Sequence, residues 1–137
     1  MTIQIIEAFK THLNTSVSKS EYDQIKKLGF KDLKVLIFDR PLSKLQSYTV
    51  YITVAHPNED DPRQNSMHLI YAYNAKINQL TLLQRSTFNY MIEYFTDFDG
   101  DGFFEILTSE SPIESPEQRF LIYLKNGVVY TNKQLIQ

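Results

Sequence analysis

The chain has no cysteine and no tryptophan, and it contains only 4 glycines. Without cysteine, a disulfide, a thiolate nucleophile and a zinc–thiolate site are all excluded. No run of apolar residues approaches the roughly 18 residues of a membrane span. The G-x-S-x-G, P-loop, dinucleotide-fingerprint and H-E-x-x-H motifs are also missing. The sequence therefore offers no familiar set of catalytic residues.

The length and charge of the chain set further limits. Its 137 residues fit a single domain, 1–137, that is long enough to bury a core. A formal net charge of -2 gives no electrostatic reason to expect nucleic acid as a partner. The N-terminus lacks the basic start and apolar core of a secretory signal. We expect a cytoplasmic protein if Met1 is the native start, and a periplasmic or secreted one if a signal peptide has been removed.

Residues 1–31 have the pattern of a helical N-terminal segment. Four apolar residues follow the spacing of a buried helical stripe: Ile5, Ile6, Phe9 and Leu13. Ser18 begins a capping box, and Gly29 stands where a left-handed C-terminal cap belongs. The pattern predicts two short helices, at residues 3–13 and 19–28.

Residues 32–137 change to a period of two, which is typical of β-strands. The dipeptide Asn126-Gly127 predicts a tight hairpin between the last two strands. Polar stretches at 56–66 and 109–117 are expected to be long loops. The predicted strands are residues 34–38, 47–55, 67–73, 79–84, 88–95, 103–108, 120–125 and 128–131.

The β region also contains a weak internal repeat. Residues 68–74 resemble residues 120–126, at a spacing of about 52 residues. A period near 50 that consists of short antiparallel strands is typical of propeller blades. We therefore expect an α+β, mainly β fold: two short N-terminal helices, then two repeats of antiparallel, blade-like sheet.

One acidic stretch indicates a chemistry. It reads Asp97-Phe98-Asp99-Gly100-Asp101-Gly102-Phe103-Phe104-Glu105. Four carboxylates this close together repel one another unless a cation lies among them, and hard oxygen donors at this density suit Ca²⁺. The two glycines allow the positive φ angles that a loop around an ion requires. The predicted ligands are the side chains of Asp97, Asp99, Asp101 and Glu105 and the main-chain carbonyl of Phe103.

The same stretch, with Ile106, Leu107 and residues 121–127, resembles an FG-GAP/VCBS-type repeat. The resemblance implies that the acidic loop precedes the first strand of a β-propeller blade and holds Ca²⁺ through Asp97, Asp99, Asp101 and Glu105. Glu105 stands where the family more often has Asp. Propellers need at least four blades, and this chain has room for two. A closed monomeric propeller is therefore excluded by length.

The EF-hand is the competing calcium motif. It requires a bidentate Glu at the twelfth loop position, where this chain has Thr108. The residues on both sides of the loop are rich in aromatic and β-branched types, which favour strands over EF-hand helices. The loop is therefore expected between two strands.

Two functions follow from these observations. The first is a non-catalytic, calcium-stabilised β module for protein recognition, either inhibitor-like or immunity-like, or an accessory to adhesion. In this interpretation the long loops contact an unidentified protein partner. The alternative is a hydrolase that acts on a glycan or phosphate ester through loop carboxylates such as Asp60 and Asp61, with His56 or His68.

A third hypothesis concerns assembly. A unit of two blades leaves strand edges that must be covered, so the chain is also considered as one part of a homo-oligomer.

Overall fold

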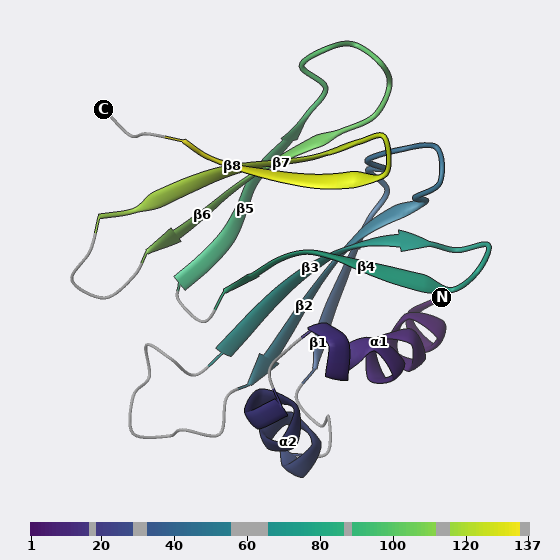
Figure 1. Cartoon of the computed structure of the whole chain (residues 1–137), viewed down its shortest axis with the longest axis vertical. Coiled ribbons are helices and arrows are strands. Elements are labelled where there is room, and N and C mark those ends of the chain that lie inside the picture. Colours follow the sequence, from purple (N-terminus) through teal and green to yellow (C-terminus); the bar gives the residue numbers. More distant parts are fainter. Residues whose placement is uncertain (17–18, 29–32, 56–65, 87–88, 112–115, 135–137) are drawn as a thin grey trace.

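The computed structural model describes residues 1–16, 19–28, 33–55, 66–86, 89–111 and 116–134. It shows a mainly β fold with two antiparallel four-stranded sheets (Figure 1). In chain order the elements are α1 (Thr2–Ser16), α2 (Lys19–Leu28), β1 (Lys34–Phe38), β2 (Tyr48–Ala55), β3 (Ser66–Asn74), β4 (Gln79–Ser86), β5 (Asn89–Thr96), β6 (Glu105–Ser111), β7 (Gln118–Lys125) and β8 (Val128–Gln134).

Each sheet is a simple meander. The first sheet has the order β1-β2-β3-β4 and the second has the order β5-β6-β7-β8. Every neighbouring pair is antiparallel, so each strand pairs with the one that follows it in sequence. The strands described here do not close into a barrel. Residues 68–74 and 120–126, which suggested the repeat, fall on or just after β3 and β7, the third strands of their sheets.

The prediction of two short helices is wrong in one respect. Helix α1 has 15 residues, because it continues beyond Leu13, where the apolar stripe ends. Only α2, with 10 residues, is a short helix. The expected caps at Ser18 and Gly29 lie outside the described residues.

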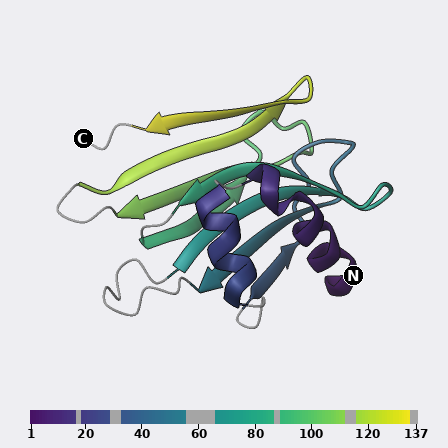
Figure 2. The same ribbon diagram turned by 60° about the horizontal axis from the view of Figure 1, so that its bottom comes forward.

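The helices and sheets form three layers (Figure 2). On one side of the first sheet, Ile5, Phe9 and Leu13 of α1 are fully buried against β2 and β3. The ring of Phe9 meets that of Tyr71 edge-on at 6.0 Å between centroids. Neither helix is long and apolar enough to cross a membrane.

A second core lies between the two sheets. Ile70 and Leu83 of the first sheet pack with Ile106 and Ile122 of the second. The first sheet is therefore covered on both faces, by the helices on one side and by the second sheet on the other. The second sheet is covered on one face only by the described elements.

The predicted hairpin between β7 and β8 is confirmed. Asn126 has a φ of 52° and Gly127 a φ of 76°. Two consecutive positive φ angles are what a type I′ turn requires, and Asn-Gly is the dipeptide that accepts them most readily.

The expected boundaries of the strand after the acidic loop are wrong. Residues 103–108 were expected, but β6 begins at Glu105 and continues to Ser111. Residues 109–111 therefore belong to a strand and not to the expected loop at 109–117. Pairing with β5 and β7 explains the difference, because partners on both sides outweigh the low strand preference of serine.

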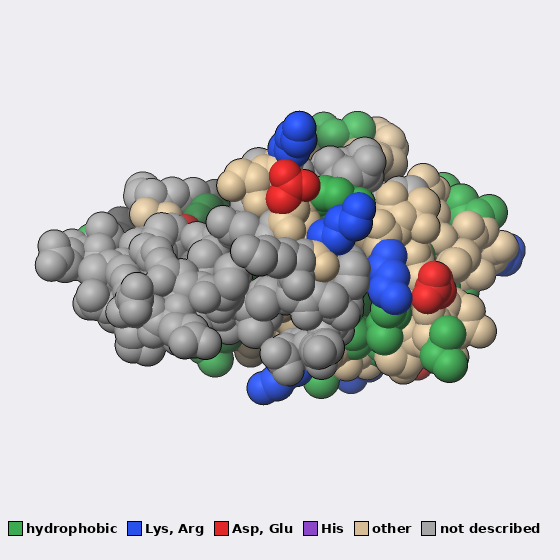
Figure 3. Space-filling model, turned by 90° about the horizontal axis from the view of Figure 1, so that it is seen from below, with side chains coloured by type: hydrophobic (Ala, Val, Ile, Leu, Met, Phe, Trp, Pro, Cys, Tyr) green, Lys and Arg blue, Asp and Glu red, His purple; other side chains and the backbone are tan. Residues whose placement is uncertain are grey.

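The helical side of the molecule carries mixed charge. Figure 3 shows this side from below, with basic and acidic side chains interspersed on its described part. No large single-sign patch is visible there.

Candidate metal site

The acidic stretch forms the loop between β5 and β6. Gly100 has a φ of 70° and Gly102 a φ of 87°. A Cβ atom added at either position would meet nothing within 4 Å. These two residues are therefore glycines because the backbone takes a left-handed conformation there, and not because space is short. The loop stands at the top of Figure 1, above the tip of the β7–β8 hairpin.

Three of the predicted ligands lie together. One carboxylate oxygen from each of Asp97, Asp99 and Glu105 lies within 4.8 Å of the other two. Oxygens that bind one Ca²⁺ at about 2.3–2.6 Å are at most about 5 Å apart. The spacing of the three oxygens therefore fits a single calcium ion, and carboxylates are the hard donors that this ion prefers.

Hydrogen bonds within the loop orient two of these carboxylates. The two oxygens of Asp97 accept from the amides of Asp101, at 3.1 Å, and Gly102, at 2.9 Å. Oε2 of Glu105 accepts from the amide of Phe98 at 3.2 Å. The loop thus ties its first and last acidic residues to its own backbone, which holds their side chains near each other.

The pKa directions reflect the crowding of negative charge. Partial burial, and then the charges of Asp99 and Asp101, raise the pKa of Glu105. Desolvation and the charge of Asp101 raise the pKa of Asp99. For Asp97, desolvation acts upward, but hydrogen bonds from Gly102, Asp99 and Asp101 outweigh it and lower the pKa. A divalent cation among these groups would relieve the repulsion.

The other two predicted ligands, Asp101 and Phe103, are not part of this group of three oxygens. Oδ1 of Asp101 accepts from the amide of Phe103 at 2.8 Å, and Asp101 is not one of the three residues whose oxygens group together. Phe103 lies two residues before β6 begins. Both residues stay predicted ligands.

The end of the loop is attached to the first sheet, which the sequence did not suggest. The amide of Phe104 donates to the carbonyl of Pro41 at 2.9 Å. The guanidinium of Arg40 lies over the Phe104 ring, 5.4 Å from its centroid. Pro41 and Phe104 are far apart in sequence, and no local pattern could have paired them.

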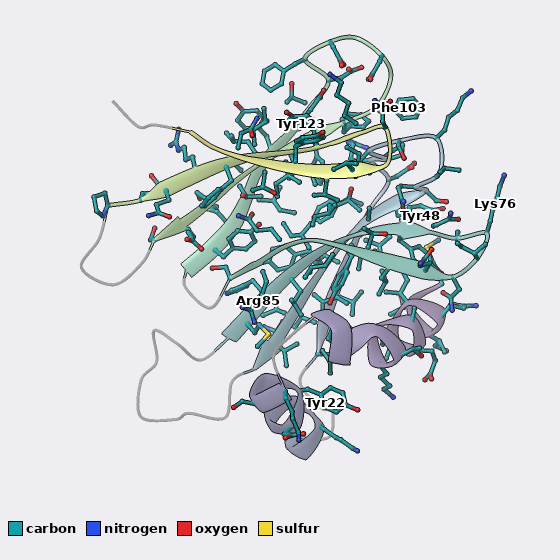
Figure 4. The ribbon with its side chains drawn as sticks, viewed as in Figure 1. Tyr22, Tyr48, Lys76, Arg85, Phe103 and Tyr123 are labelled. Carbon is teal, nitrogen blue, oxygen red and sulfur yellow. The ribbon has the colours of Figure 1, made fainter. Side chains whose placement is uncertain are left out.

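An open pocket of about 620 Å³ lies between the loop and the end of β7. The residues that line it include Asp99, Asp101 and Glu105 from the loop and Leu121 and Tyr123 from β7. Phe103 and Tyr123 are labelled close to this region in Figure 4. The pocket combines acidic and apolar walls, and the candidate ligands of the ion form part of it.

A separate polar cluster lies where the two sheets meet. The Tyr51 hydroxyl is 2.6 Å from Nδ1 of His68 and 3.3 Å from the carbonyl of Tyr90. Burial lowers the pKa of His68 and raises the pKa of Tyr90. Gln84 accepts hydrogen bonds from the hydroxyls of Tyr90 and Thr108. This network joins the first sheet to the second.

The cluster bears on the hydrolase alternative. His68 contacts Tyr90 near the start of β5, whereas the acidic loop follows the end of that strand. Eight strand residues span about 26 Å, so His68 cannot act together with Asp97 or Asp99. His56, Asp60 and Asp61 lie outside the described residues, and the alternative through them stays a prediction.

No family model matches this chain, and neither does any curated protein or solved structure.

Proposed function

We propose that this protein is a non-catalytic β module that is stabilised by Ca²⁺ and recognises another protein. The observation that carries the proposal is the group of three carboxylate oxygens from Asp97, Asp99 and Glu105, all within 4.8 Å of one another. With Asp101 and the carbonyl of Phe103, these residues would surround one ion. The ion would supply positive charge that offsets the repulsion and orders the loop ahead of β6.

The arrangement of strands supports the resemblance to FG-GAP/VCBS repeats. Each four-stranded antiparallel meander has the connectivity of a propeller blade. The acidic loop differs in position, because it precedes β6, the second strand of its sheet, and not the first strand as the resemblance implies. Two such sheets stacked on each other make a short blade pair. In this proposal the ion has a structural role and takes part in no reaction.

Recognition is supported by the surface around the loop. Phe98 is 65% exposed at the loop, and the adjoining pocket has both apolar and acidic walls. An aromatic side chain held at the surface beside a pocket is typical of a contact point for a protein partner. Inhibitor-like, immunity-like and adhesion roles all use a contact of this kind.

A thermal melt in excess Ca²⁺ and in EDTA tests the metal part. Binding to the native state alone adds about 2.7 kcal/mol when the ion is at 100 times its Kd. That corresponds to a rise in Tm on the order of 10 °C. An unchanged Tm across this comparison removes calcium from the proposal.

A matched pair of variants locates the site. The double variant Asp99→Asn with Glu105→Gln removes two charges while keeping the size of each side chain, so the calcium-dependent rise in Tm should disappear. Asp39→Asn removes one exposed carboxylate outside the group and should leave the rise intact. If both variants respond to Ca²⁺ as the wild type does, the ion binds elsewhere.

The recognition part needs a purified partner. Candidates captured in Ca²⁺ by the wild type, but not by the double variant, would be purified and titrated against both proteins by calorimetry. We expect binding that weakens at least tenfold in EDTA. A partner that binds both proteins equally would show that the calcium loop is not part of the contact.

A further inference from the structure

The second sheet has a face that no described helix or strand covers. We call it the outer face, and it is the side of β5–β8 that points away from the first sheet. In Figure 1 it is the upper side of the molecule, next to the acidic loop. Its principal apolar side chains are Met91, Tyr94, Leu107, Leu121, Tyr123 and Tyr130.

The register of the strands places these residues on one face. Ile106 and Ile122 are fully buried between the sheets and pair directly with each other. Side chains alternate along a strand, so Leu107 and Leu121, the next residues on β6 and β7, point outward. Tyr94 pairs with Leu107 and lies on the same side.

The outer face is apolar and exposed. Met91 is 54% exposed, Tyr94 51% and Tyr130 40%. The rings of Tyr123 and Tyr130, on neighbouring strands β7 and β8, stack on each other at 5.2 Å with an interplanar angle of 12°. Contiguous patches of this kind mark interaction sites on soluble proteins.

Charge at the two ends of the face indicates the partner. The acidic loop stands at the end where β6 begins. Arg119 stands at the other end, since it pairs with Ser109 near the end of β6. Arg119 is exposed, and its ion pair with Glu117, at 3.9 Å, is also exposed to solvent. The face therefore carries a cluster of carboxylates at one end and, at the other, a guanidinium whose ion pair is solvent-exposed and weak.

A second copy of this chain complements that pattern. A two-fold axis in the plane of the interface and perpendicular to the strands lays one outer face on another with the strand direction reversed. Each acidic loop then meets Arg119 of the other copy. An axis parallel to the strands would bring the two acidic loops together, and like charges would oppose it. We propose that this protein forms a homodimer through its outer faces, with the axis perpendicular to the strands.

The size of the face fits a weak but specific dimer. A tyrosine side chain offers about 150–250 Å², so Tyr94 and Tyr130 each leave roughly 60–130 Å² to be covered. With the other side chains the face gives on the order of 500 Å² per copy, or about 1,000 Å² for the pair, at the lower limit of stable interfaces. We expect a Kd in the micromolar range.

This inference does not depend on calcium. Without a bound ion, the four carboxylates of the loop outnumber the two nearby cations, Lys125, which lines the pocket, and Arg40, which lies over the Phe104 ring. The loop therefore keeps a net negative charge in EDTA, where its attraction to Arg119 is tested. An unchanged Tm in the calcium test would not contradict the dimer. A protein that stays monomeric would not contradict the calcium site.

Sedimentation velocity in EDTA, over protein concentrations from about 1 µM to 1 mM, tests the dimer. The wild type should pass from monomer to dimer. The double variant Tyr94→Arg with Tyr130→Arg should weaken the dimer at least tenfold. The matched control is Ile77→Arg, at a position that is 62% exposed in the turn between β3 and β4 and should have no effect. A monomeric wild type, or a double variant that associates as the wild type does, overturns the proposal.

Charge reversal tests the orientation without altering the apolar side chains. Arg119→Glu and Asp101→Arg should each weaken association at least threefold, and the two changes together should restore it. Equal far-UV spectra would show that all variants fold alike. If the combined variant associates no better than the singles, the acidic loop does not meet Arg119 and the proposed dimer is wrong.

Discussion

Gly102 lies in the acidic loop and has a φ of 87°. Residues other than glycine adopt this backbone conformation only with strain. Replacement by alanine should cost about 1–2 kcal/mol in the free energy of unfolding, because no neighbouring atom contributes to the penalty. Urea denaturation in EDTA measures it. Gly102→Asn is the matched control and should cost less, since asparagine tolerates the left-handed region better. Equal costs would mean that the strain is not conformational.

His68 is the residue whose protonation the fold opposes. Burial lowers its pKa from 6.5, so below pH 6.5 the unfolded chain binds a proton more readily than the folded chain. The free energy of unfolding should therefore be highest above pH 6.5 and fall as the pH drops through the folded pKa.

The variant His68→Asn tests this dependence. Its side-chain amide has both a donor and an acceptor that can replace Nδ1 in the hydrogen bond with the Tyr51 hydroxyl, but it does not titrate. Denaturation curves from pH 7.5 to 5 should have a shallower slope for the variant than for the wild type. Parallel slopes would assign the acid sensitivity to other groups.

At the level of elements, α1 depends on a narrow apolar stripe. Phe9 is 0% exposed and lies in the core beneath the first sheet, whereas Ile3 on the same helix is 76% exposed. Phe9→Ala should destabilise the protein by about 3–5 kcal/mol through lost burial and a cavity. Ile3→Ala, the control, should change stability by less than about 0.5 kcal/mol. A mild effect at Phe9 would indicate that α1 is not docked as described.

The elements also show how far the sequence could predict this fold. Alternating hydrophobicity located every strand, and Asn126-Gly127 predicted its hairpin, because both signals are local. The start of β6 was missed because Phe103 and Phe104 have strong strand preference, yet the bonds to Asp101 and Pro41 hold them in the loop. The length of α1 was missed because polar residues continue a helix without extending its apolar stripe.

In the candidate site, too, the sequence predicted the local features and missed the long-range contacts. The sequence predicted the acidic loop, since its carboxylates lie within nine positions of one another. It could not predict the contact of Phe104 with Pro41, or the network around Gln84, Tyr90 and Thr108, because these depend on how the two sheets stack.

At the level of the whole molecule, the two sheets share one core and a set of polar bonds. Ile70, Ile106 and Ile122 are fully buried between them, and the Ser86 hydroxyl donates to Glu110 at 2.8 Å. Separating the sheets would expose this core, so we expect them to unfold together. Circular dichroism and tyrosine fluorescence should give coincident urea transitions. Two separate transitions would show that the sheets are independent units.

The hydrogen bond from the amide of Phe104 to the carbonyl of Pro41 has a mechanical consequence. It joins the end of the acidic loop, which belongs to the second sheet, to the connection between β1 and β2 in the first, so the loop links the two layers. An ion that stiffens the loop would also restrict rocking of one sheet against the other. Calcium would then slow amide hydrogen exchange in β1 and β2, which carry none of its ligands.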